Sequence, residues 1–261
     1  MIRLIASDID GTLLPYGQTE LPDPLFEIIS RLIGAGIMFC AASGRQYHSL
    51  RKLFAPVADE ICFLCENGAV VFGPGKEDTA LLLSKTAFDR CDAMAIISDI
   101  MASPGCSPLI SSPRTSYLCS PDPDYQYLME TEKSYRITCI DDPEEIEDDI
   151  VKISAYCPGN LSETESRLAP LWQDRFNVAV AGREWLDFTI ASKGDGLRDL
   201  CEALRIDRAH VAAVGDNWND LPMLEYSGKP WIMSDSDPAL CRLIPNHCTD
   251  VSRLLSSFIN G

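Results

Sequence analysis

Ile2-Arg3-Leu4-Ile5-Ala6-Ser7-Asp8-Ile9-Asp10-Gly11-Thr12 is a short apolar run that breaks into two acidic residues and a glycine. A run of this length and composition predicts a buried β-strand. Residues two apart on an extended chain point to the same face, so this strand would deliver the carboxylates of Asp8 and Asp10 together at its C-terminal end. Gly11 allows the backbone to turn sharply beside them.

Two carboxylates held this close repel each other unless a positive charge lies between them. A divalent cation provides one, and Mg²⁺ suits a site with few carboxylates and a substrate phosphate. In such a site one aspartate can attack phosphorus while the other transfers protons. The motif alone also fits a solvated turn, so its meaning depends on the rest of the chain.

The composition is that of an acidic globular protein. The 261 residues are 46% hydrophobic and 23% charged, which is enough for one large domain or for a core with a second module. The net charge, 22 − 39 = −17, disfavours a nucleic-acid backbone or an anionic membrane as a partner. No stretch approaches the roughly 20 apolar residues of a membrane span, and the N-terminus runs straight into a charged motif, so we expect a cytoplasmic protein.

The eleven cysteines are an odd number scattered through apolar runs. This pattern favours reduced, buried thiols over a disulfide framework. Cys62 and Cys65 have C-x-x-C spacing, but they lie in a strand-like run without a second such pair, so we do not expect a zinc site.

The next elements predict a β-strand, α-helix, β-strand unit. Residues 22–34 have apolar side chains at helical spacing and end in glycines, and the apolar run 37–42 follows. Two strands that are apolar throughout, joined by a helix, indicate a right-handed unit of a parallel sheet. The second strand breaks into Ser43-Gly44-Arg45, whose hydroxyl and amide groups form either a phosphate cradle or a simple helix cap. Arg45 would then bind substrate or pack on the surface.

A third strand is expected at 61–65, where it ends in Glu66-Asn67-Gly68, and a hairpin is expected at 69–84. After residue 84 the pattern of the sequence changes. Residues 85–184 contain no long apolar strand that breaks into a catalytic-looking turn, and we interpret them as an inserted module. Within it we expect a helix at 88–101, strands at 115–119 and 150–157, a helix at 162–174 and a hairpin at 176–190. The acidic run 141–149 fits a solvated loop or helix start.

The sequence pattern of the core returns at Lys193, which precedes a helix that ends near Leu204. The small buried strand 211–214 then leads into Gly215-Asp216-Asn217-Trp218-Asn219-Asp220, so acidic groups again follow a strand. A helix at 221–225, a strand at 231–233 and a helical tail complete the chain. Binding sites in parallel sheets lie beyond the carboxyl ends of the strands, so we expect these groups to converge. A lysine among the carboxylates would neutralise charge and orient a nucleophile.

Taken in this order, the motifs resemble those of the haloacid dehalogenase-like superfamily, in particular its Cof-type sugar-phosphatase branch (subclass IIB). The resemblance spans residues 1–84 and 185–261 and implies an α/β fold, a Rossmann-like parallel-sheet core, with residues 85–184 as an inserted α/β cap of the second type that selects substrate. The motifs that carry it are Asp-x-Asp-Gly-Thr, Ser-Gly-Arg, Glu-Asn-Gly, Ser-Lys-Gly and Gly-Asp-x-x-Asn-Asp.

The resemblance also implies roles for individual residues in a Mg²⁺-dependent phosphatase. Asp8 would be the nucleophile, Asp10 the general acid and base, and Lys193 would steady Asp8 and the phosphate. The phosphate would be held by Ser43, Gly44, Arg45 and Asn219. The metal would be held by Asp8, the backbone carbonyl of Asp10, Asp216 and Asp220. Asp220 would either bind the metal or hold Lys193.

Other interpretations remain open at this stage. A sugar phosphomutase would use the same fold, and a phospho-receiver signalling module also forms an aspartyl-phosphate, although the Asp8-x-Asp10 spacing and the long insert count against it. The absence of G-x-G-x-x-G after the first strand counts against a plain nucleotide-binding domain.

In the cap, Arg183, Glu184 and Trp185 either touch substrate or play a structural part. After the last motif, Met233-Ser234-Asp235-Ser236 stands where the family commonly has an Asn-Ala pair. The sequence gives neither the natural substrate nor the oligomeric state.

Overall fold

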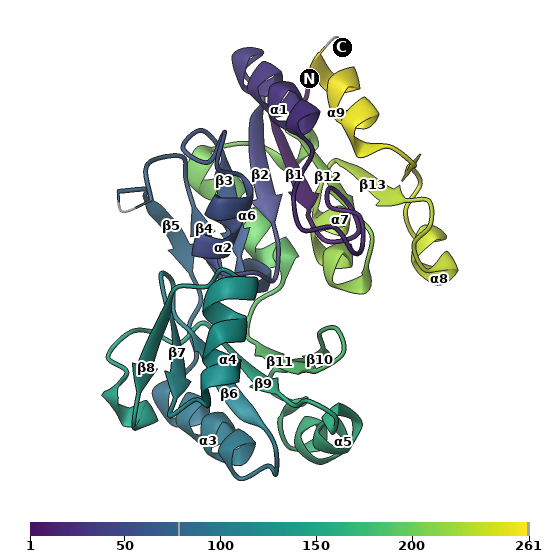
Figure 1. The fold of residues 1–261 in the computed structure, drawn as a ribbon. Helices are drawn as coiled ribbons and strands as arrows, with labels where there is room; N and C mark the ends of the chain where they lie inside the picture. Colours follow the sequence, from purple (N-terminus) through teal and green to yellow (C-terminus); the bar gives the residue numbers. More distant parts are fainter. Residues whose placement is uncertain (78, 260–261) are drawn as a thin grey trace. The chain divides into compact units, whose positions relative to one another are not determined.

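The computed structural model describes residues 1–77 and 79–259, which form two compact units (Figure 1). The first comprises Met1–Arg45, Leu50–Ser84 and Ser192–Gly261, and the second comprises Gln46–Ser49 and Lys85–Ala191. The second unit thus extends seven residues beyond the boundary expected at 184. The reason is that strand β11 (Trp185–Thr189) pairs with strands of that unit on both of its edges.

The first unit contains an eight-stranded sheet with the order β14-β13-β12-β1-β2-β3-β4-β5. All neighbours from β14 to β3 are parallel, and β4 is antiparallel to β3. The expected α/β fold with a parallel-sheet core is therefore confirmed. The strands are β1 (Leu4–Asp8), β2 (Met38–Ala42), β3 (Cys62–Cys65), β4 (Val70–Phe72), β5 (Leu82–Lys85), β12 (Val211–Gly215), β13 (Lys229–Met233) and β14 (His247–Cys248).

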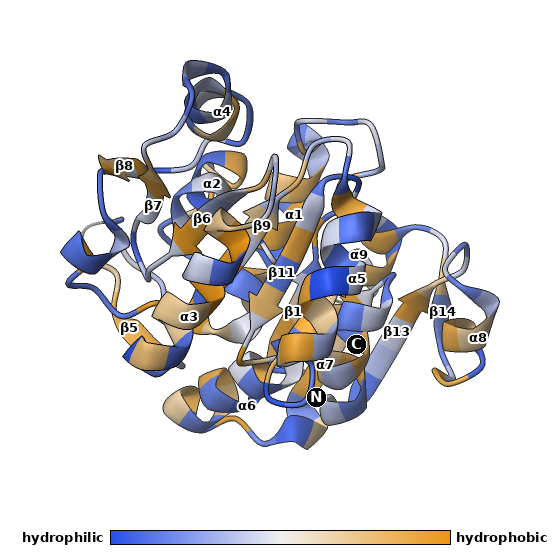
Figure 2. Ribbon diagram, turned by 90° about the horizontal axis from the view of Figure 1, so that it is seen from below, coloured by the Kyte–Doolittle hydropathy of each residue, from blue (hydrophilic) through white to orange (hydrophobic). Residues whose placement is uncertain are grey.

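The central strands β1 and β12 are buried along their whole length, as strands covered on both faces must be. Helices with one apolar face cover the sheet, and Figure 2 shows this division of hydrophobic and hydrophilic residues along the chain. These helices are α1 (Asp23–Gly34), α2 (Tyr47–Leu53, whose first residues group with the second unit), α6 (Lys193–Leu204), α7 (Leu221–Tyr226), α8 (Pro238–Cys241) and α9 (Val251–Ile259).

The second unit is a six-stranded sheet with the order β10-β11-β9-β6-β7-β8. Helices α3 and α5 pack on one face, over a cluster that includes Ile96, Ile153 and Phe188. The predicted hairpin at 176–190 is confirmed as β10 and β11, and the helices at 88–101 and 162–174 as α3 and α5. The elements are α3 (Arg90–Met101), β6 (Ser107–Ser111), β7 (Ser116–Cys119), α4 (Pro123–Tyr127), β8 (Ile137–Ile140), β9 (Lys152–Tyr156), α5 (Leu161–Trp172), β10 (Asn177–Val180) and β11.

Strands β6 and β8 and helix α4 were not predicted. Ser107-Pro108-Leu109-Ile110-Ser111 mixes turn-forming and apolar residues, and Ile137-Thr138-Cys139-Ile140 is too short and too polar on its flanks to be distinctive. Both become strands by pairing with neighbours that were predicted: β6 lies between β7 and β9, and β8 pairs with β7. Among the described residues, no helix is long and apolar enough to span a membrane.

Helix α6 lies very close to the turn after β3. An added Cβ at Gly196 would come within 2.7 Å of the Cα of Gly68 and 2.8 Å of its carbonyl oxygen. This close approach brings the start of α6, and with it Lys193, next to the sheet.

We therefore expect Gly196→Ala to lower the free energy of unfolding by about 1–3 kcal/mol, because the methyl group has to displace backbone. Gly34→Ala is the matched control in α1, where an added Cβ has no neighbour within 4 Å. It should be neutral or stabilising by up to about 1 kcal/mol through helix propensity. Urea unfolding measures both, and equal effects would refute the close-packing argument.

Candidate active site at the carboxyl edge of the parallel sheet

A lysine lies buried between two carboxylates at the end of β1. The Nζ atom of Lys193 donates to Oδ1 of Asp8 at 2.5 Å and to Oδ1 of Asp220 at 2.6 Å. All three residues are at most 5% exposed. Because water cannot solvate these charges, they depend on each other for stability.

The local structure explains why Lys193 and Asp220 meet. Ser192 caps helix α6 in a reciprocal capping box with Asp195, which fixes Lys193 as the first residue of the helix. The second oxygen of Asp220 accepts hydrogen bonds from the backbone N–H groups of Asp216 and Asn217, at 3.0 and 3.1 Å. Both oxygens of Asp220 are thus engaged, one by the loop and one by Lys193.

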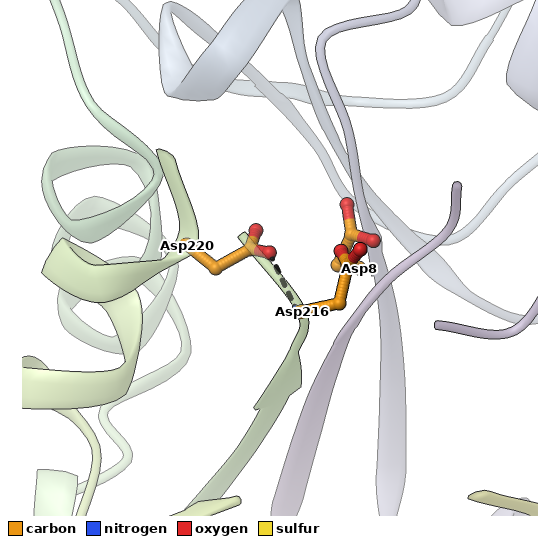
Figure 3. Close-up of side chains that lie close together, drawn as sticks. All are labelled: Asp8, Asp216 and Asp220. Atoms are coloured by element: carbon orange, nitrogen blue, oxygen red, sulfur yellow. Dashed lines mark hydrogen bonds between the residues drawn. The ribbon is translucent and has the colours of Figure 1, made fainter. Parts of the chain in front are cut away.

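Asp8, Asp216 and Asp220 form an acidic cluster in which one oxygen of each lies within 4.8 Å of the others. Figure 3 shows the Asp8 and Asp216 carboxylates next to each other, with Asp220 pointing towards them from the following turn. The Oδ2 atom of Asp8 is buried and accepts no hydrogen bond within the described part of the chain. A buried carboxylate oxygen without a partner is costly, and a cation beside it would remove that cost.

Burial and an excess of negative charge both shift the pKa values in this cluster. Burial, together with the nearby Asp220 carboxylate, raises the pKa of Asp8 above its usual range. Burial and Asp220 also raise the pKa of Asp216. Burial lowers the pKa of Lys193, but Asp220 and Asp8 outweigh it and hold that pKa above its usual range. Lys193 therefore stays charged, and one lysine balances only part of the charge of three aspartates.

Tyr16 approaches the cluster from the loop after β1. Its hydroxyl donates to Oδ2 of Asp216 at 2.8 Å, and the hydroxyl of Thr12 lies 3.4 Å from Oδ1. Gly11 makes room for this contact: its φ is +94°, and an added Cβ would come within 2.1 Å of Asp216 and 2.7 Å of the Tyr16 hydroxyl. A side chain at position 11 would therefore displace both groups.

Asp10 pairs with Arg45, the residue that follows Ser43-Gly44. The Nε of Arg45 donates to Oδ2 of Asp10 at 2.9 Å and a terminal nitrogen donates to Oδ1 at 2.5 Å. The side chain of Asp10 is 45% exposed and that of Arg45 is 32% exposed, so this bidentate pair is open to solvent and can exchange partners.

The remaining predicted residues lie around the turns after β2 and β3. Ser43 is buried, and its hydroxyl accepts the backbone N–H of Arg45 at 3.2 Å, as a turn-forming serine does. An added Cβ at Gly44 would come within 3.1 Å of the Asn67 side chain, and Asn219 donates to the Asn67 oxygen at 3.3 Å. Asn67 therefore connects two of the predicted phosphate-binding positions.

Sequence reasoning missed Tyr16 and the contact role of Asn67. Tyr16 lies in a loop whose composition carries no chemical signal, whereas Asn67 was visible in Glu66-Asn67-Gly68, one of the motifs of the resemblance, but was given no role of its own. In the second unit, Trp185 lies 4.8 Å from Tyr156 between ring centres and 6.3 Å from Tyr125, so it belongs to an aromatic cluster of that unit. Arg183 is exposed and Glu184 half-buried.

We expect Lys193→Met to destabilise the protein by roughly 3–5 kcal/mol near pH 7.5, because it leaves two buried carboxylates unbalanced. A buried carboxyl with a raised pKa destabilises the fold as pH rises above its unfolded value of about 3.9, so the loss should shrink towards pH 5. Lys85→Met is the control, since Lys85 pairs with Asp149 at the surface, and should cost less than about 1 kcal/mol. A similar small, pH-independent cost for Lys193→Met would contradict the charge-balance argument.

Comparisons with known proteins identify the family of this chain. The family model described as haloacid dehalogenase-like hydrolase matches residues 5–251. The chain is 28% identical over 249 residues to the 5-amino-6-(5-phospho-D-ribitylamino)uracil phosphatase of Escherichia coli strain K12, covering 92% of this chain and 88% of that protein. It is 25% identical to the pyridoxal phosphate phosphatase of the same organism, covering 91% and 90% of the two chains.

Solved structures share the fold over nearly the whole chain. A crystal structure from Eubacterium rectale has a TM-score of 0.84 at 27% identity and covers 98% of this chain and 99% of its own. The subclass IIB sugar phosphatase BT4131 has a TM-score of 0.79 at 16% identity, with 98% of each chain covered, which shows a common fold. The match of the family model and the relatives named as phosphatases together show that this chain belongs to the haloacid dehalogenase-like hydrolases and is an enzyme of their phosphatase group.

Proposed function

We propose that this enzyme is a Mg²⁺-dependent phosphatase that hydrolyses a small phosphorylated metabolite through an aspartyl-phosphate on Asp8, with sugar phosphates as the first substrate class to test. The observation that carries the proposal is the state of the Asp8 carboxylate. Lys193 holds Oδ1, while Oδ2 is buried and has no hydrogen-bond partner among residues 1–77 and 79–259. One oxygen is thus fixed in place and the other is available to a cation or to phosphorus.

The residues present fit a magnesium site. Asp8 and Asp216 offer carboxylate oxygens next to each other, and the resemblance adds the backbone carbonyl of Asp10. Oxygen ligands of this kind, completed by water and phosphate, are those that Mg²⁺ prefers. Asp220 is fully buried, with one oxygen on the ammonium of Lys193 and the other on two backbone N–H groups, so we assign it to holding Lys193 and the loop. Asp216 is only half-buried and its partners are the hydroxyls of Thr12 and Tyr16, so we assign it to the metal. When bound, Mg²⁺ would supply positive charge to the carboxylates and to the phosphate oxygens.

The reaction would proceed in two steps on the side chains of the first unit. Asp8 attacks phosphorus, the bond to the substrate oxygen breaks, and Asp10 gives a proton to the leaving alcohol. Asp10 then takes a proton from a water molecule that attacks the aspartyl-phosphate, which frees Asp8 and releases inorganic phosphate. Lys193 remains charged throughout and stabilises the negative charge that develops around Asp8.

Arg45 would connect substrate binding to proton transfer. In the observed arrangement its guanidinium engages both oxygens of Asp10, so Asp10 must leave Arg45 before it can protonate an alcohol. A phosphate group competes for the same bidentate donor. Substrate binding at Arg45 would therefore release Asp10 for catalysis, while Ser43, Gly44 and Asn219 hold phosphate oxygens at the turns.

The names of two relatives support the class of substrate. Relatives named for a phosphoribitylamino-uracil and for pyridoxal phosphate support a small phosphorylated metabolite. Residues 85–191 of the second unit would select the substrate, as the cap of the family does, and substitution of Arg183, Glu184 and Trp185 tests their part in it. One fold hosts many substrates, so selectivity has to be measured.

Asp8→Asn should lower phosphate release by at least about a thousand-fold, because it removes the nucleophile at almost unchanged volume. The assay uses a panel of sugar phosphates, nucleotides and small phosphoesters, with Mg²⁺ or with EDTA. Asp174→Asn, at an exposed position of the second unit, is the control and should keep wild-type activity. Activity retained in Asp8→Asn would overturn the assignment. Consumption of substrate without free phosphate would instead indicate a mutase.

Asp10→Asn should reveal the general acid by its dependence on the leaving group. For a sugar phosphate, whose alcohol needs a proton, kcat/KM should fall by about 10²–10⁴-fold. For p-nitrophenyl phosphate, which leaves without one, the fall in kcat/KM should be much smaller. Equal losses for both substrates would show that Asp10 does not protonate the leaving group.

A further inference from the structure

Two cysteines of the second unit face each other across neighbouring strands. Cys106 directly precedes β6, and Cys157 directly follows β9. These strands are antiparallel with Ser107 opposite Tyr156, so extending the register by one residue places Cys106 opposite Cys157. Their sulfur atoms lie 3.0 Å apart, and Cys106 donates to Cys157.

The backbone geometry suits a covalent bond between them. Residues directly opposite each other in an antiparallel pair have Cα atoms about 4.5–5.5 Å apart. Disulfides span Cα separations of roughly 4.4–6.8 Å, so the register itself provides the required spacing. The bond would form without movement of either strand.

The two thiols have different surroundings. Cys157 is fully buried, whereas Cys106 is half-buried and reaches solvent. The hydroxyl of Thr164 on α5 lies 3.2 Å from the Cys106 sulfur. Burial and the neighbouring Cys106 raise the pKa of Cys157 to about 12, so Cys157 is not the first target of an oxidant, which reacts with thiolates. An oxidant arriving from solvent therefore meets Cys106 first and finds Cys157 already in contact with it.

We propose that Cys106 and Cys157 are a redox-sensitive pair that a hydroperoxide closes into an intramolecular disulfide and that a thiol reductant opens again. The Cys106 sulfur attacks one peroxide oxygen, the O–O bond breaks, and a sulfenic acid and water (or an alcohol) form. The Cys157 sulfur then attacks the Cys106 sulfur, the S–O bond breaks, and the thiol proton leaves with hydroxide as water. Both sulfur atoms are oxidised by one electron each, and the peroxide takes up the two electrons.

The bond would tie the start of β6 to the end of β9, close to the beginning of α5. It would close a loop from 106 to 157 that contains β6, β7, β8 and β9. Such a loop restricts the unfolded chain, so the oxidised protein should unfold at a higher temperature than the reduced protein.

The test treats the full-length protein with hydrogen peroxide, blocks the remaining thiols and maps the cysteines by mass spectrometry. We expect a disulfide-linked peptide pair holding Cys106 and Cys157, and a fall in titratable thiols in denaturant from eleven to nine, since two of the eleven pair. Dithiothreitol should restore all eleven, and the Tm should rise on oxidation and fall on reduction.

Substitutions separate this pair from the other cysteines. Cys106→Ser and Cys157→Ser should each abolish the loss of two thiols and the shift in Tm, whereas Cys91→Ser, at an exposed position of α3, should retain both. The experiment on the wild-type protein does not depend on either variant folding. A sulfinic or sulfonic acid at Cys106 with Cys157 still a thiol, a disulfide between other cysteines, or no loss of thiols would overturn the proposal.

Discussion

The buried contact of Lys193 with Asp8 and Asp220 is the interaction on which the rest of the site depends. It joins three segments that are far apart in the sequence, the end of β1, the start of α6 and the turn after β12. A buried ion pair of this kind is costly to break and adds little to stability compared with apolar packing. Its value lies in specificity, because it fixes one oxygen of Asp8 and leaves the other available.

The topology of the sheet makes that contact possible. Strands β1 and β12 are parallel neighbours, so Asp8 and Asp216 leave the sheet at the same edge. The close approach of Gly196 to Gly68 brings α6 near enough for Lys193 to reach both carboxylates. Burial is the largest cause of the raised pKa of Asp8, and the excess of negative charge that three aspartates and one lysine leave adds to it and favours the proposed cation.

Much of this arrangement was predictable from the sequence, because apolar strands that end in Asp8, Ser43 and Asp216 predict a parallel sheet with polar groups at one edge. The contacts between side chains were not. Nothing in a single sequence shows that Arg45 turns to Asp10 or that Tyr16 reaches Asp216 from a loop, since both depend on three-dimensional geometry. The second unit was harder still, because its strands β6 and β8 have weak local patterns and form through pairing with β7.

The most direct test of the central claim is a crystal structure of the protein with Mn²⁺, an oxygen-binding substitute for Mg²⁺ that anomalous scattering identifies. We expect one ion in contact with the carboxylates of Asp8 and Asp216, while both oxygens of Asp220 keep their bonds to Lys193 and to the loop. An ion that displaces Lys193 from Asp220, or an ion bound elsewhere with the Asp8 oxygen still without a partner, would contradict it.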